Sequence, residues 1–243
     1  MEHPSLLQFE VEPHLAKYNV PMKDFAASHP EYSCFVTGAH IFSTGRTDEF
    51  YNLNRCSSLP HVSSSPKIGP MVGETNTQSQ QPRVLLLQRS LTDSYPGYWE
   101  GPGGSCESTD LTLLESLARE VREESGLHVS RVQELVGIET WDRNEGKDPR
   151  PNEIPVLVAR FLFLVDVHEA NPLRYSGDFD FSGAGGWEHA IQMAPEEHTQ
   201  YMWVTEDHFK IWHEEEQRDG EKNMFAGDIQ HYFKTFQLIN SRR

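Results

Sequence analysis

Apolar and polar positions along the chain follow two periods, and each period predicts a type of element. Short runs rich in β-branched and aromatic side chains predict strands. These strands cover residues 33–43, 83–87, 128–140, 154–167 and 200–204. Apolar residues that recur every three to four positions predict helices. The helices cover residues 21–27, 110–125, 205–216 and 224–239.

The order of these elements predicts the domain organisation. Strands interleaved with helices are typical of an α/β layered sandwich around a mixed sheet. Residues 33–243 are predicted to form one domain, preceded by an N-terminal extension at 1–32. Residues 44–82 are rich in Ser, Pro, Asn and Gln and have little periodicity. Because a clean strand resumes at Arg83, this stretch is interpreted as a flexible insertion between two strands.

The helix predicted at 110–125 has an apolar stripe formed by Leu114, Leu117, Ala118 and Val121. Residues at i, i+3, i+4 and i+7 lie on one side of a helix, so this stripe is expected to face the core. The other sides of the same helix are therefore free to carry polar chemistry.

Three carboxylates share one of those other sides. Glu120, Glu123 and Glu124 come together at about 100° per residue, between a predicted cap at Asp110 and a left-handed end at Gly126. Their mutual repulsion costs stability, and a hard cation with oxygen ligands would relieve it. The plain alternative is an acidic, solvated helix face.

The surrounding residues favour the cation. Residues 119–127 read Arg-Glu-Val-Arg-Glu-Glu-Ser-Gly-Leu and follow Gly103-Gly104. This pattern closely resembles the Nudix box, G-x5-E-x7-R-E-U-x-E-E-x-G-U with U aliphatic, and its second half matches without a gap. The resemblance extends over about residues 33–209. It implies a Nudix α/β/α sandwich around a mixed β-sheet.

The first half of the box departs from the pattern. Counted forward from Gly104, the isolated glutamate falls on Asp110; counted back from Arg119, it falls on Leu111. One extra residue therefore lies in the loop. Three alternatives stay open: Asp110 takes the place of that glutamate, a displaced Glu107 does, or the group is missing.

The resemblance also implies a reaction and a metal site. Members of this family hydrolyse a diphosphate linkage in a small molecule, often a nucleoside diphosphate derivative, with Mg²⁺ or Mn²⁺. By this resemblance Glu120, Glu123, Glu124 and the carbonyl of Gly104 would bind the cation. Arg119 would hold the glutamates in position through ion pairs.

The catalytic base and the substrate contacts are assigned on the same grounds. A carboxylate must take the proton of the attacking water. Glu123 is preferred, and Glu197, in the loop before the last strand, is the alternative base or an additional ligand. Gly103 lets the backbone approach phosphate oxygens, and Arg89 is also assigned to substrate binding.

Other side chains are weaker candidates. Trp141, Trp187, Tyr98 and Tyr175 could stack on a flat group, although aromatic side chains more often pack in a core. Cys106 is near the site in sequence, but it is interpreted as a bystander because no partner arrangement for a nucleophile is evident.

Two other functions remain as alternatives. The first is a non-catalytic Nudix-fold module that binds or senses a nucleotide, which the altered first half of the box keeps open. The second is isomerisation of an isoprenoid diphosphate. That chemistry needs a cysteine–glutamate pairing that the sequence does not show.

The composition of the chain limits the kinds of partner that it is expected to bind. The chain has 37 acidic and 21 basic residues and a formal net charge of -16. This charge argues against binding of long nucleic acids, which depends on many Lys and Arg side chains. The first residues do not resemble a signal peptide, and no apolar run has transmembrane length. The prediction is a cytoplasmic enzyme, with the nucleus as an alternative location and a homodimer compatible with the sequence.

Overall fold

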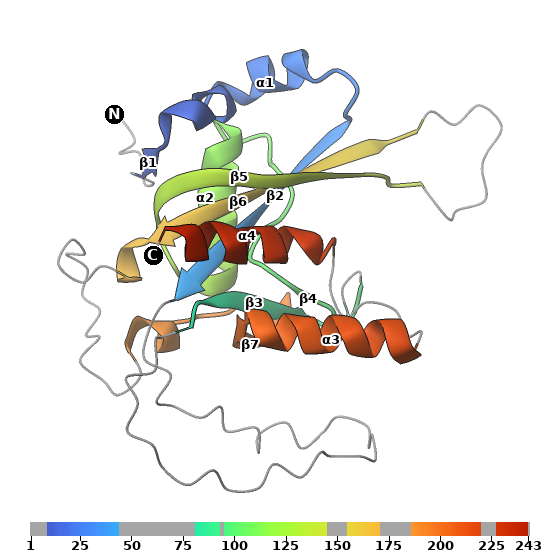
Figure 1. The fold of residues 1–243 in the computed structure, drawn as a ribbon. Helices are drawn as coiled ribbons and strands as arrows, with labels where there is room; N and C mark the ends of the chain where they lie inside the picture. The colour runs from blue at the N-terminus through green and yellow to red at the C-terminus, as the bar shows by residue number, and fades with distance from the viewer. Residues whose placement is uncertain are drawn as a thin grey trace, which may run out of the picture.

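The computed structural model describes residues 9–43, 81–92, 95–144, 155–170, 186–219 and 227–242. Within these residues seven strands form one mixed sheet, and helices cover both of its faces (Figure 1). The strands are β1 (Glu10–Val11), β2 (Cys34–Ser43), β3 (Arg83–Arg89), β4 (Trp99–Glu100), β5 (Val129–Asp142), β6 (Leu157–Val167) and β7 (His198–Thr205). The helices are α1 (Met22–Ser28), α2 (Leu113–Ser125), α3 (Glu206–Asp219) and α4 (Gln230–Ser241), with short 3-10 turns η1 (Pro13–Tyr18), η3 (His168–Ala170) and η4 (Gly186–His189). The predicted sandwich around a mixed sheet is confirmed.

The sheet divides between β2 and β3, and this division positions the site. Its strand order is β1-β5-β6-β2-β3-β4, and β7 pairs with β3. β2 is parallel to β6 along most of its length, but it pairs with β3 only at Phe42 and Ser43. Before Phe42, β2 does not pair with β3, and the loop after β4 lies along that edge of β2 instead. The N–H groups of Thr37 and Ala39 donate to the carbonyls of Gly104 and Pro102.

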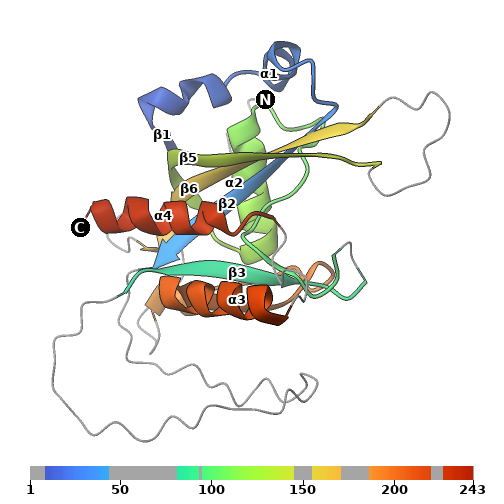
Figure 2. The ribbon, with the colours of Figure 1, turned by 45° about the vertical axis from the view of Figure 1, so that its right-hand side comes forward.

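Helices lie on opposite faces of the sheet. Figures 1 and 2 both show α2 behind the sheet and α4 in front of it, with α3 against the β3–β7 end. The stripe predicted from the sequence is buried: Leu114, Leu117, Ala118 and Val121 are all inaccessible. A second cluster joins β3 and β7 to the C-terminal helices through residues such as Phe209.

The segment predicted as an N-terminal extension also contributes to this structure in its described part. β1 runs parallel to the first half of β5. Leu15, Tyr18 and Phe25 are buried in the same cluster as the α2 stripe. The domain boundary near residue 33 stays a prediction. Most of the predicted insertion at about 44–82 lies outside the described residues.

Two predicted helix starts need correction. α2 begins at Leu113 and its cap is Thr112, whose hydroxyl accepts the Glu115 N–H at 3.1 Å. Asp110 is not the cap, because its carboxylate is bound elsewhere. The last helix starts at Gln230 instead of about residue 224. Within the described chain, no helix has the length and apolar character needed to span a bilayer.

Candidate functional site

Helix α2 presents the three predicted carboxylates beside the loop that follows β4. Gly126 ends the helix in the left-handed conformation, as predicted, with φ 73°. The apolar stripe fixes the rotation of the helix against the sheet. As a result Glu120 and Glu124 point inward and are buried, and the Glu123 side chain remains 58% exposed.

The two glycines of the loop are required by close contacts. A Cβ at Gly103 would lie 2.2 Å from the carbonyl oxygen of Thr37, and one at Gly104 would lie 2.7 Å from the Glu120 carboxylate. Because the loop is squeezed between β2 and α2, only glycine fits. The N–H of Gly103 donates to Glu124 Oε2 at 2.7 Å. The Gly104 carbonyl accepts from β2, and its second lone pair leaves room for a further ligand.

Arg119 binds three carboxylates around the start of this site. Its Nε and Nη2 donate to the two oxygens of Asp110 at 2.9 and 3.0 Å. The guanidinium also lies 3.0 Å from Glu120 Oε1 and 2.8 Å from Glu123 Oε2. This bidentate geometry fixes the guanidinium between the loop and the helix.

Of the three alternatives for the displaced glutamate, the structure places Asp110 against Arg119. Burial alone would raise the pKa of Asp110, but hydrogen bonds from Arg119 and from the Glu107 backbone lower it. Asp110 is therefore held ionised. The extra loop residue changes the path of the loop without separating a carboxylate from the arginine.

The ionised forms of the buried glutamates are disfavoured by burial and by neighbouring negative charges. Burial raises the pKa of Glu124 to about 9, and the neighbouring charges of Glu100, Glu120 and Glu197 add to this effect. Burial likewise raises the pKa of Glu120 to about 7, although Arg119 works against the shift. In the protein alone these groups retain protons that they would release in water.

Glu197 approaches the same place from the loop that precedes β7. It is exposed immediately before β7, and its backbone carbonyl accepts the Ser90 N–H at 2.7 Å. One ligand atom each from Glu124, Glu197 and the buried His198 lie within 4.8 Å of one another. Residues far apart in the sequence thus converge on one point.

These groups open into a cleft of about 890 Å³. This size lies in the range of small-molecule sites. The cleft is lined from β5, β6, the β3–β4 connection, α2 and the start of α4. Its residues include the predicted set: Arg89, Gly103, Gly104, Arg119, Glu120, Glu123, Glu124 and Glu197.

Glu100 and Arg160 are among the charged residues of the cleft that were not predicted as site residues. Glu100 is buried and bonds to Arg89 Nη1, while Arg160 Nη2 lies 3.3 Å from its other oxygen. Arg89 thus lines the cleft as expected, but its guanidinium already has a carboxylate partner. A single arginine within the apolar run of β6 was the available signal for Arg160.

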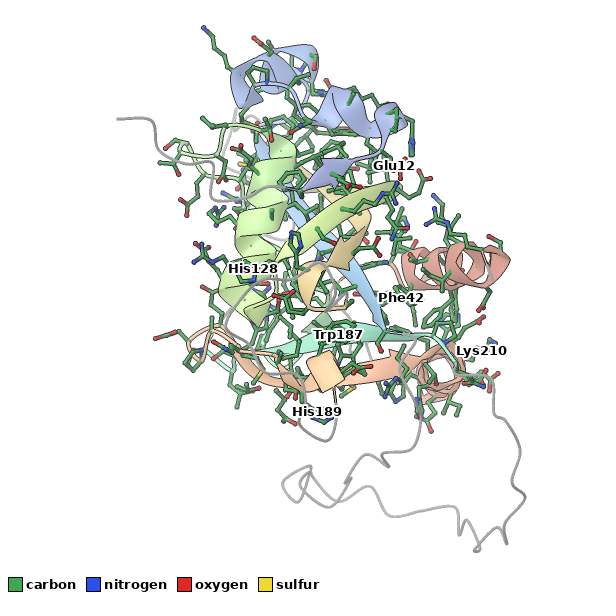
Figure 3. All side chains as sticks on the ribbon, turned by 90° about the vertical axis from the view of Figure 1, so that its left-hand side faces the viewer. Glu12, Phe42, His128, Trp187, His189 and Lys210 are labelled. Carbon is green, nitrogen blue, oxygen red and sulfur yellow. The ribbon has the colours of Figure 1, made fainter. Side chains whose placement is uncertain are left out.

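The aromatic candidates separate into two groups. Trp187, which Figure 3 labels, packs edge-on against Trp203, with ring centroids 5.1 Å apart. Trp141 and Tyr98 line the cleft. Tyr175 lies outside the described residues. Burial raises the pKa of the Cys106 thiol to about 11, which agrees with its interpretation as a bystander.

The donor set fits a divalent cation. Several carboxylate oxygens and a backbone carbonyl are the hard ligands that Mg²⁺ and Mn²⁺ take. Two of the carboxylates are buried without an equal number of positive charges, and a bound cation would remove that imbalance.

Comparison with known proteins gives the family. A model of the NUDIX domain matches residues 71–226. No curated protein matches the chain. Among solved structures it is similar to a MutT Nudix hydrolase from Burkholderia pseudomallei, with 16% identity, 72% of this chain and 84% of that chain covered, and a TM-score of 0.38. It is also similar to the E. coli ORF135 protein, with 18% identity, 86% and 92% covered, and a TM-score of 0.43. An Ap4A hydrolase from C. elegans has 14% identity, with 86% and 98% covered and a TM-score of 0.39. Since the domain model spans more than half of the sequence, the chain belongs to the Nudix family.

Proposed function

We propose that this protein is a Nudix hydrolase that cleaves a diphosphate linkage in a small molecule, with Mg²⁺ or Mn²⁺ as cofactor. The observation that supports this most directly is the pair of buried carboxylates, Glu120 and Glu124. They lie beside the backbone of two glycines in a cleft large enough for a nucleotide. A nucleoside diphosphate linked to a second group is the substrate class.

Each residue of the set has a role in this proposal. Glu120, Glu123, Glu124 and the Gly104 carbonyl hold the cation. When bound, a divalent cation neutralises the diphosphate, polarises the phosphorus and lowers the pKa of a water molecule in its shell. Arg119 is a positioning residue, because its ion pairs hold the carboxylates of Glu120 and Glu123 in place.

The remaining groups orient the substrate and take a proton. Gly103 allows phosphate oxygens to approach the backbone, and Arg89, held by Glu100, presents its guanidinium at the cleft wall. Glu123 is already bound to Arg119, at 2.8 Å. We therefore now assign the proton acceptor to Glu197, which faces the cluster from an exposed loop, in place of the preference for Glu123 based on sequence.

Hydrolysis of a panel of substrates with Mg²⁺ and with Mn²⁺ tests the proposal. The panel contains nucleoside triphosphates, nucleotide sugars, dinucleotides and prenyl diphosphates. We expect release of a monophosphate or phosphate from at least one class, no release in EDTA, and loss of release in Glu123→Gln.

Glu115→Gln is the matched control, because it makes the same change on the same helix. Glu115 bonds to the Leu111 N–H at 3.2 Å and does not line the cleft. It should keep full turnover. Binding of a nucleotide with metal but without any product would favour the alternative, a non-catalytic binding module.

A further inference from the structure

The C-terminal helix α4 contacts the glycine loop of the site, although it lies across the sheet from α2 (Figure 1). The Gly101 N–H donates to the Tyr232 hydroxyl at 3.0 Å, a contact between residues 131 positions apart. Gly101 directly follows β4 and leads into Gly103 and Gly104. The match with the NUDIX domain ends at residue 226, so this contact joins the loop to a helix beyond the matched residues.

The Tyr232 side chain is buried and its ring is held by two stacked neighbours. The ring centroid lies 4.2 Å from that of His40, with 9° between the planes, and 4.8 Å from that of Phe209. His40 is itself fixed, because its Nδ1 forms a hydrogen bond of 2.8 Å with the Thr235 hydroxyl, about one turn further along α4. Close packing of this kind leaves the Tyr232 hydroxyl a single position.

The backbone of Gly101 has little room to leave this contact. A Cβ at Gly101 would lie 2.3 Å from the Ala39 carbonyl oxygen and 3.7 Å from the Tyr232 hydroxyl. The carbonyl of the next residue, Pro102, accepts the Ala39 N–H at 2.8 Å. The start of the loop is therefore held between β2 on one side and Tyr232 on the other.

The groups assigned to the cation follow within three residues of this contact. The Gly103 N–H donates to Glu124 at 2.7 Å, and the Gly104 carbonyl is the proposed backbone ligand. A shift of the backbone at Gly101 would move both groups relative to α2. A misplacement of about 1 Å can lower turnover roughly a hundredfold, so a fixed loop matters for the reaction.

We propose that Tyr232 is a positioning residue of this site. Through the Gly101 N–H it fixes the loop that presents Gly103 and Gly104 to the cation and to the diphosphate. Helix α4 thus takes part in the chemistry without supplying a ligand or a base. This inference rests on the proposed function for the metal and for the reaction.

Tyr232→Phe tests the inference, because it keeps the stacked ring and removes the acceptor of the Gly101 N–H. Burial raises the pKa of Tyr232, so the hydroxyl is uncharged and the change removes no charge. Tyr18→Phe is the matched control. Tyr18 is 5% exposed and Tyr232 is 6% exposed, but Tyr18 packs on Phe161 and Phe163, away from the loop.

Two measurements at a temperature where both variants are folded give the answer, and thermal unfolding in EDTA sets that temperature. We expect Tyr232→Phe to lower kcat by roughly tenfold to a hundredfold, with KM little changed because the cleft wall is intact. Calorimetry without substrate should show weaker Mn²⁺ binding, since the Gly104 carbonyl is less well placed. Tyr18→Phe should keep both values.

The outcomes separate this inference from the proposed function. A loss of kcat or of Mn²⁺ affinity in Tyr232→Phe beyond that in Tyr18→Phe supports a positioning role. Unchanged values in Tyr232→Phe, or equal losses in both variants, overturn it. If the unmodified protein hydrolyses no compound of the panel, the proposed function fails, and the Mn²⁺ affinities alone decide the role of Tyr232.

Discussion

Two buried glutamates of this protein, Glu100 and Glu124, have the same exposure and opposite surroundings. Both are 4% exposed. Glu100 on β4 lies between two guanidinium groups, those of Arg89 and Arg160. Its charge is therefore compensated within the fold.

Glu124 on α2 has a different environment. The Gly103 N–H donates to it, and the nearby charges of Glu100, Glu120 and Glu197 raise its pKa further. Among the described residues, no lysine or arginine forms an ion pair with it. Burial without compensation is expensive, so a protein retains it where a ligand supplies the missing charge. The difference supports the proposal that Glu124 binds a cation, whereas Glu100 is compensated by residues of the fold.

The largest expected effect is on activity. Glu124→Gln keeps the size and shape of the side chain and removes a ligand, so turnover should fall by orders of magnitude. Since Glu124 holds a proton near neutral pH in the protein alone, the midpoint of thermal unfolding without metal should stay equal or rise. Turnover assays and thermal unfolding in EDTA and in Mg²⁺ measure both. Near-normal turnover of Glu124→Gln would contradict the contrast drawn between Glu124 and Glu100.

The next effect is on stability, at the other glutamate. Glu100→Gln removes the carboxylate that bridges the guanidinium groups of Arg89 and Arg160, which should lower the free energy of unfolding by about 3–5 kcal/mol. Urea unfolding of the two Gln variants side by side checks this. The contrast is lost if Glu124→Gln is destabilised as much as Glu100→Gln.

The two glutamates also differ in how far the sequence could predict them. Glu124 was assigned because its position depends on local geometry: a helix period, a glycine end and a contiguous motif. The Glu100–Arg160 contact joins residues 60 positions apart. It depends on the register of β2 with β6 and on the loop that follows β4. No local pattern contains that information, so the pair could be found only in the fold.

The front of the motif shows the same limit on a smaller scale. Counting residues left three alternatives open: Asp110, a displaced Glu107 and an absent group. The bidentate contact between Asp110 and Arg119 could not be read from that count, because it depends on the path of a loop with one extra residue. The same holds for the aromatic residues, since Trp141 and Trp187 are alike in sequence and differ only in what covers them.

A third, smaller effect is a dependence of stability on pH. The pKa of Glu124 is raised from 4.5 to about 9, so the folded protein keeps a proton that the unfolded chain has released. Without metal, the free energy of unfolding should therefore fall as pH rises from 7 to 9. The buried His40, with its pKa lowered to about 3 by burial, changes charge only at lower pH.

Unfolding midpoints at pH 7, 8 and 9 measure this dependence. Mg²⁺ should flatten the decline because the bound carboxylate is ionised, and Glu124→Gln should flatten it without metal. The assignment is contradicted if the unmodified protein and the variant give the same profile in EDTA.

The last effect concerns Glu197, a third kind of carboxylate that is neither compensated nor buried. Because it approaches the Glu124 cluster from an exposed loop, it can meet a water molecule there without losing an ion pair. We expect Glu197→Gln to lower turnover by roughly a hundredfold, the scale of general-base catalysis, and to remove the acidic limb of the pH–turnover profile. Metal affinity, measured by calorimetry, should change little.

Glu196→Gln, the adjacent exposed carboxylate outside the cleft, is the control and should keep the full profile. An acidic limb that persists in Glu197→Gln and disappears in Glu123→Gln would return the role of base to the helix. The cleft would then need only the carboxylates of α2 for its chemistry, and Glu197 would be an ordinary surface residue at its rim.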